Sequence, residues 1–146
     1  MANINIEVKD YSAEYLKEME STVRKGVVDI GNDVQSVARQ AAPEKTQNLL
    51  RHITVSTSFS SGAYQAEIES TAVDPVTGHD YVDWMHNGRY RLGPTSRAKG
   101  MASSRIGNFR KRVGRNYLQG IGDIGKKGYQ NYMETQVSDL NSKYGQ

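Results

Sequence analysis

A long helical pattern that ends at a proline constrains this fold more than any other feature of the chain. Apolar residues recur along it at steps of three and four, at Leu16, Met19, Val23, Val27, Ile30, Val34, Val37 and Ala41. This spacing places them along one side of a helix. Asp10 and Ser12 are suitable N-caps, and Pro43 ends the pattern because the residue before a proline resists the helical conformation. We therefore predict a long amphipathic helix that ends at Pro43.

The remaining side of this predicted helix is polar. Its members are Lys17, Glu20, Arg24, Gln35 and Arg39. Gly26 and Gly31 interrupt the pattern, and a glycine inside a helix costs about 1 kcal/mol relative to alanine. Their presence indicates either close packing against a neighbouring element or a bend.

A pattern of period two follows the helix and predicts a β-hairpin. Residues 46–51 form a short turn or helical cap that leads into the first strand. Ile53, Val55, Thr57 and Phe59 then share one face, and Ser60-Ser61-Gly62 forms a turn. On the returning strand Tyr64, Ala66 and Ile68 alternate with Gln65, Glu67 and Glu69. Glu67 and Glu69 therefore point the same way, on a face next to water.

The two ends of the chain complete the predicted order of elements. Residues 4–8 alternate as a short strand, and helical spacing resumes from Tyr117 to Leu140. Four glycines, Gly120, Gly122, Gly125 and Gly128, weaken the first half of that last helix. The order strand, helix, strand, strand, loop, helix predicts one α+β domain over residues 1–146. A small, mostly antiparallel sheet would carry the long N-terminal helix and the C-terminal helix packed on it.

The stretch between the hairpin and the last helix has weaker patterns. Residues 73–79 carry loop signals, and residues 81–85 are compatible with a strand or one helical turn. Residues 95–112 are basic, rich in Ser and Gly, and poor in apolar side chains. We predict that they form an exposed loop that is disordered in the free subunit and orders on contact with a partner.

Positive charge is concentrated in one segment. The net charge is only +3, but the basic segment from residue 89 to residue 115 contains nine Lys and Arg residues and neither Asp nor Glu. Tyr90 and Phe109 are interleaved with this charge, a pattern found in nucleic-acid contacts. The alternative is a surface that docks on an acidic patch of a neighbouring protein subunit, where charge speeds encounter and fixes register. The sequence favours the protein partner, because one segment and not a whole face is basic.

Several kinds of chemistry have no matching residues in the sequence. The chain has no cysteine, so disulfides and thiolate nucleophiles are excluded. His52, His79 and His86 are not spaced as metal ligands, and no nucleophile–base set can be named. Residues 120–125 superficially resemble a dinucleotide fingerprint, but they follow no buried strand. We therefore expect a protein that is not an enzyme and has no cofactor or metal. We also expect neither a membrane-spanning helix nor a secretory signal, because no apolar run is long enough and residues 1–7 lack a basic start and an apolar stretch.

Three segments resemble a known family. Residues 42–53 resemble the Ala-Pro-x-x-Thr-Gly-x-Leu-x-x-Ser-Ile stretch of the phage head–tail joining family, with Gln47 and His52 replacing its glycine and serine. Residues 81–88 are similar to the family's Tyr-Ala-x-x-Val-Glu-x-Gly, with His86 in place of the glutamate. Residues 113–118 are similar to its late Phe-Leu element. The resemblance covers roughly residues 12 to 140.

The resemblance implies a structural virion protein of a tailed bacteriophage. Such a subunit forms a homo-oligomeric ring, six-fold or twelve-fold, in the neck that joins the DNA-filled head to the tail. Its partners would be the neighbouring connector or stopper and the tail terminator, and DNA would pass only through the central channel. It would be assembled in the host bacterial cytoplasm and would not contact a membrane. The alternative function is that of a small DNA-binding protein that uses the basic segment.

Aromatic and arginine side chains dominate the energetics of protein interfaces. On that ground we select candidate interface residues from the exposure-prone part of the chain. They are Tyr81, Trp84, Tyr90, Arg91, Arg97, Arg105, Arg110, Arg112 and Arg115.

Overall fold

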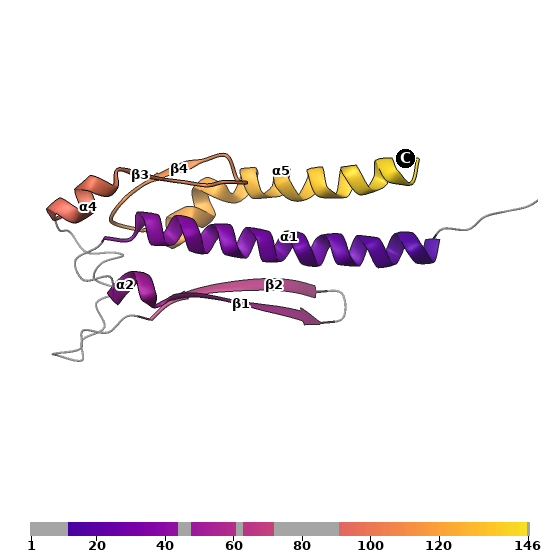
Figure 1. The fold of residues 1–146 in the computed structure, drawn as a ribbon, viewed down its shortest axis with the longest axis horizontal. Coiled ribbons are helices and arrows are strands. Elements are labelled where there is room, and N and C mark those ends of the chain that lie inside the picture. The colour runs from indigo at the N-terminus through magenta and orange to yellow at the C-terminus, as the bar shows by residue number, and fades with distance from the viewer. Residues whose placement is uncertain (1–11, 44–47, 61–62, 72–90, 146) are drawn as a thin grey trace, which may run out of the picture.

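Helix α1 runs through the middle of the molecule, between two hairpins (Figure 1). The computed structural model describes residues 12–43, 48–60, 63–71 and 91–145. The first part contains α1 (Ser12–Ala41), α2 (Asn48–Arg51), β1 (Ile53–Ser60) and β2 (Ala63–Ser70). The second contains α4 (Pro94–Lys99), β3 (Met101–Ser103), β4 (Arg110–Arg112) and α5 (Gln119–Lys143). The α+β class predicted from the sequence is confirmed.

The strands among the described residues form two separate antiparallel hairpins. In the first, β1 pairs with β2 over eight residues each, from Ile53 opposite Ser70 to Ser60 opposite Ala63. In the second, β3 pairs with β4 over only three residues each, with Ala102 opposite Lys111. The first of these, β1–β2, confirms the hairpin predicted from the period-two pattern. The predicted strand at residues 4–8 and the predicted elements at residues 73–85 lie outside the described residues.

Helix α1 packs on two sides, and this makes it the central layer. Gly31 faces the first hairpin, where an added Cβ would lie 2.9 Å from the Cβ of Ala66. Gly26 faces α5, where an added Cβ would meet the side chain of Met133. The two glycines therefore mark close packing, which was one of the two predicted possibilities. Helix α5 lies beside α1 on the side away from the first hairpin (Figure 1).

The core gathers at the C-terminal half of α1. Its largest fully buried side chains are Tyr117, Ile53, Ile121 and Val37. At the other end of α1, Leu16 is 65% exposed, although the helical spacing placed it on the apolar side. The apolar pattern of this helix therefore extends beyond the core cluster, whose members in α1 begin at Ile30.

The prediction that residues 95–112 form an exposed loop is wrong, because this segment contains most of α4 and the whole of β3 and β4. Helix α4 begins at Pro94, and β3 and β4 form a hairpin that packs on α1 and α5. Ala102 in β3 is fully buried, and Lys111 in β4 is 7% exposed. The segment has few apolar residues, and it is anchored instead by polar and backbone contacts to residues remote in the sequence.

Candidate functional site

The basic segment is folded as an outer layer, and β4 sets which of its charges face solvent. Arg110 and Arg112 alternate with Lys111, and the two arginines are exposed while the lysine is buried. Met101 and Ser103 of β3, which pair with Arg112 and Arg110, lie on the same outward face. Alternation along a strand is the reason, because neighbouring side chains point to opposite faces. The outward face of β3–β4 is therefore a basic surface.

A buried carboxylate holds this layer against the helices. Asp33 of α1 is 6% exposed. Its Oδ2 accepts hydrogen bonds from the hydroxyls of Ser104 at 2.5 Å and Tyr129 at 2.7 Å. Its Oδ1 accepts one from the backbone N–H of Arg105 at 2.9 Å. One side chain thus ties α1, the β3–β4 loop and α5 together.

Two tyrosines of α5 have raised pKa values for the same kind of reason. Burial, and then the hydrogen bond to Asp33, hold the pKa of Tyr129 well above its ordinary value. Burial and the hydrogen bond to Asp29, 2.7 Å long, raise the pKa of Tyr132 to about 12. Both phenols therefore stay protonated at neutral pH and act as hydrogen-bond donors. Their role is to fix α5 against α1.

Two lysines of the basic segment serve the fold of the subunit. Lys99 donates from its Nζ to the carbonyl oxygens of Arg39 at 2.8 Å and Ala42 at 2.7 Å. It therefore satisfies carbonyls at the C-terminus of α1, where a positive charge is favourable. Lys111 is the inward-facing residue of β4, and its Nζ donates to the carbonyl oxygen of Arg115 at 3.4 Å. Burial lowers the pKa of Lys111.

The corner after α1 lies at the base of this layer. Ala41, Ala42 and Pro43 are buried. The N–H of Gly114 donates to the carbonyl of Ala41 at 2.7 Å, which joins the end of β4 to the end of α1. On the other side, Gln35 donates to the carbonyl of Ile53 at 2.9 Å, where β1 begins. The corner therefore connects both hairpins to the same helix end.

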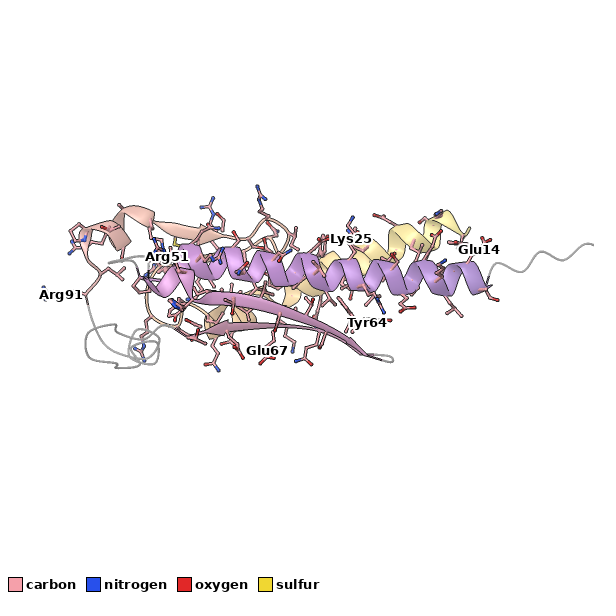
Figure 2. The ribbon with its side chains drawn as sticks, turned by 60° about the horizontal axis from the view of Figure 1, so that its bottom comes forward. Glu14, Lys25, Arg51, Tyr64, Glu67 and Arg91 are labelled. Atoms are coloured by element: carbon pink, nitrogen blue, oxygen red, sulfur yellow. The ribbon has the colours of Figure 1, made fainter. Side chains whose placement is uncertain are left out.

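The outward face of the first hairpin has the opposite character. Thr54, Ser56 and Ser58 of β1 are exposed, as are Gln65, Glu67 and Glu69 of β2. Figure 2 shows Glu67 on the side of the hairpin turned away from α1. The inward face packs on α1, and at its far end Arg24 stacks over the rings of Phe59 and Tyr64 at 5.0 and 5.7 Å. The exposed face of β1–β2 is therefore polar and acidic, as the alternation predicted.

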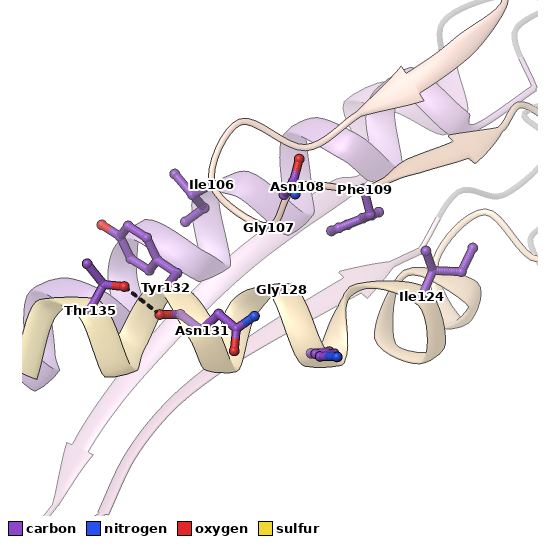
Figure 3. A pocket seen from close by; sticks show the side chains of 10 residues that line it. Ile106, Gly107, Asn108, Phe109, Ile124, Gly128, Asn131, Tyr132 and Thr135 are labelled. Carbon is purple, nitrogen blue, oxygen red and sulfur yellow. Dashed lines mark hydrogen bonds between the residues drawn. The ribbon is translucent and has the colours of Figure 1, made fainter.

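A surface pocket of about 550 Å³ lies between the β3–β4 loop and α5 (Figure 3). Ile106, Asn108 and Phe109 line it from the loop. From α5 it is lined by Ile124, Lys127, Gly128, Asn131, Tyr132 and Thr135. The Thr135 hydroxyl donates to the carbonyl of Asn131 within the helix, at 2.9 Å. The lining therefore mixes apolar, amide, ammonium and hydroxyl groups.

The structure places only some of the predicted interface residues. Tyr81, Trp84 and Tyr90 lie outside the described residues. The six arginines are all exposed, and they are Arg91, Arg97, Arg105, Arg110, Arg112 and Arg115. Among them, Arg110 and Arg112 are brought onto one face of β4, whereas Arg97 lies on α4 and donates to the carbonyl of Leu92 at 2.8 Å. Asp33 and the inward position of Lys111 were missed, because an isolated Asp in a helix and one Lys in a basic run carry no pattern.

Among the described residues, no three or more His, Cys, Asp or Glu side chains are grouped so that they could hold a metal ion. In the same part of the chain, neither long helix has an apolar stretch that could cross a membrane. Comparisons with protein-family models, with curated proteins and with solved structures find no match for this chain.

Proposed function

We propose that this chain is a structural subunit of the neck of a tailed phage. Copies of it form a ring that joins the DNA-filled head to the tail, and DNA passes through the central opening. The observation that carries this proposal is the corner between α1 and β1. Within residues 42–53, which resemble the first motif of the head–tail joining family, the described residues lie at the end of α1, in α2 and at the start of β1. In that family a long helix precedes this stretch, a hairpin follows it and a C-terminal helix comes last, and α1, β1–β2 and α5 have the same order along this chain.

The distribution of charge supports a role in assembly. A subunit of a ring presents two different surfaces to its two neighbours. Here the outward face of β1–β2 carries Glu67 and Glu69, and that of β3–β4 carries Arg110 and Arg112. Arg91 and Arg115, near the two ends of the basic segment, are also exposed and would contact the neighbouring rings of the neck. The mechanism is therefore contact between folded surfaces, and no chemical step is involved.

The location of the protein in virions tests this proposal. We expect an epitope tag on its C-terminus to be seen by electron microscopy at the head–tail junction. Lysates without the protein should contain DNA-filled heads and separate tails that do not join. Intact, joined virions in such lysates, or a tag on the capsid shell or the tail tip, would contradict a role in the neck.

The exposed arginines favour a second candidate, a small DNA-binding protein. Arg105 lies in the loop of the β3–β4 hairpin, Arg110 and Arg112 lie in β4, and all three are exposed. If they contact phosphates, the affinity of the free subunit for duplex DNA should fall with salt, with a slope of about −0.9 in log–log form per phosphate neutralised. The variant Arg110→Glu/Arg112→Glu should then lose binding. Salt-independent or undetectable binding by the native chain would exclude this candidate.

A further inference from the structure

The two hairpins carry matched charges on their outward faces. Glu67 and Glu69 are two residues apart on β2, and Arg110 and Arg112 are two residues apart on β4. Residues at this spacing on a strand point the same way and lie about 6.7 Å apart, which is two rises of about 3.3–3.4 Å. The two carboxylates on β2 are therefore spaced along their strand as the two guanidinium groups are along β4, and their charges are opposite.

These four side chains have no ion-pair partner within the described part of the subunit. Ion pairs do form elsewhere in the molecule, between Arg24 and Glu20 at 2.9 Å and between Lys143 and Glu18 at 3.0 Å. All four side chains on the hairpins are exposed. They are therefore free to meet charges on another molecule.

The two faces lie on opposite sides of the molecule. Helix α1 separates β1–β2 from β3–β4 (Figure 1), and Figure 2 shows Glu67 directed away from α1. The two faces of one copy therefore cannot meet each other. An acidic face on one side and a basic face on the other fit a head-to-tail contact between copies, which closes into a ring when the rotation per copy allows it.

We propose that the outward face of β1–β2 of one copy binds the outward face of β3–β4 of the next copy. Glu67 and Glu69 pair with Arg110 and Arg112 across this contact. Arginine suits the role because its planar fork can bind a carboxylate through two parallel hydrogen bonds. The inference rests on the ring assembly proposed above and identifies the surface through which the ring closes.

The chemistry of these faces fixes how the contact responds to salt. Both faces are mostly polar, and their side chains are Thr54, Ser56, Ser58, Gln65, Met101 and Ser103 besides the four charged residues. Exposed charges are screened over about 30 Å at 0.01 M ionic strength but over about 8 Å at 0.15 M. Association of the free subunit should therefore be strongest at low salt and weaken as salt is added.

Charge reversal provides the test. The variant Glu67→Lys/Glu69→Lys has two basic faces, and the variant Arg110→Glu/Arg112→Glu has two acidic faces. By analytical ultracentrifugation at low salt, we expect native chains to form oligomers. Each variant alone should associate about tenfold more weakly or worse, because like charges meet across the contact. A mixture of the two variants should recover oligomers that contain both.

Matched controls separate the local contact from net charge. Glu134→Lys/Asp139→Lys on α5 changes the net charge as the first variant does, and Lys17→Glu/Lys25→Glu on α1 changes it as the second does. All four control side chains are exposed. Both control variants should associate as the native chain does. An equal loss in the controls would overturn the proposal, since it would show a general charge effect.

A cross-linking measurement does not depend on the reversed charges. The native chain has no cysteine, so introduced cysteines are the only thiols. Ser56 lies opposite Glu67 and Ser103 lies opposite Arg110. With a short bis-maleimide, Ser56→Cys/Ser103→Cys should give a ladder of linked dimers, trimers and higher species. Either single variant should give no species above a dimer.

The outcomes separate this inference from the proposed function. A protein at the head–tail junction whose rings survive both charge reversals, with no ladder, would refute this contact and leave the neck function standing. Charge-dependent association with a ladder of cross-linked species, in a protein that is absent from the head–tail junction, would support this contact and refute the neck function. A native chain that stays monomeric at low salt and high concentration would also overturn the contact. If the native chain binds duplex DNA, loses that binding in Arg110→Glu/Arg112→Glu, and does not self-associate, the basic face binds DNA and the proposed contact is refuted.

Discussion

The two hairpins are held to α1 by different physical means. The β1–β2 hairpin has eight-residue strands, and side chains such as Ile53 and Val55 face the helix. The β3–β4 hairpin has three-residue strands, and Ala102 is its one fully buried apolar side chain. A buried carboxylate, Asp33, holds the loop of the second hairpin from 71 residues away in sequence. A long hairpin is therefore specified by its own alternation, whereas a short one depends on groups that only the tertiary structure brings to it.

The largest effect should come from removing the carboxylate that holds the second hairpin. Asp33→Ala leaves the Ser104 hydroxyl, the Arg105 N–H and the Tyr129 hydroxyl without their acceptor. Buried donors without partners cost about 1–3 kcal/mol each, so we expect a loss of about 3–4 kcal/mol in the free energy of unfolding, measured by urea denaturation. Asp29→Ala on the same helix removes one hydrogen bond, to Tyr132, and should cost about 1 kcal/mol. Equal losses would mean that Asp33 is not the anchor.

The next effect should come from the contact between the second hairpin and α5. A Cβ at Gly128 would overlap the carbonyl oxygen of Gly107, which is a backbone group that no side-chain rotation can move. Gly128→Ala should therefore destabilise the fold by about 2–3 kcal/mol, measured by thermal unfolding. Gly122→Ala in the same helix meets nothing within 4 Å and should stabilise it by up to about 1 kcal/mol. If both alanines stabilise the helix, the hairpin does not pack as closely as the structure shows.

The corresponding glycine at the first hairpin should be more tolerant. An alanine at Gly31 would place its Cβ 2.9 Å from the Cβ of Ala66 and 3.1 Å from Cγ2 of Val55. These are side-chain atoms on a two-stranded sheet that can shift, and the helix gains about 1 kcal/mol from the better helix former. We expect Gly31→Ala to cost about 1 kcal/mol or less in the same thermal measurement. A loss greater than that of Gly128→Ala would reverse the comparison between the hairpins.

The smallest effect concerns Lys111, the buried lysine of β4. Burial lowers the pKa of Lys111, so the folded state resists the charge that the unfolded state accepts. Lys111→Met should therefore raise the free energy of unfolding at pH 7 by about 0.5 kcal/mol, the cost of the buried charge less the lost hydrogen bond to Arg115. Below its folded pKa the charge opposes folding, and the penalty disappears as pH rises toward the ordinary lysine value of about 10.4. The gain from Lys111→Met should shrink over that range in a series of denaturation curves, whereas a constant gain would point to packing alone.

Elements with a long pattern were predicted correctly from the sequence. Helix α1 ends at Ala41, two residues before Pro43, and β1 and β2 follow the period-two spacing from Ile53. Helix α5 also forms in spite of its four glycines. Burial was harder to predict, because the spacing that places Leu16 on the apolar side of α1 does not tell where the core stops.

The candidate site was predicted only in part. The exposure of Arg110 and Arg112 follows from a run of basic residues, since charged side chains are rarely buried without a partner. That they share one face, with Lys111 turned inward, depends on β4 being a strand. Three residues rich in positive charge carry no strand signal, and β4 forms because β3 pairs with it and Asp33 fixes the connecting loop.

The sequence by itself determined the long helix, its end at Pro43, the first hairpin and the segment in which positive charge gathers. Local propensity and periodicity decide these features, because each depends on residues near one another in the chain. Only the tertiary structure decided that the basic segment is a folded layer and that Arg110 and Arg112 lie on the outward face of β4. The reason is that contacts such as those of Asp33 and Lys99 join residues 57 to 96 positions apart, and no local pattern encodes such contacts.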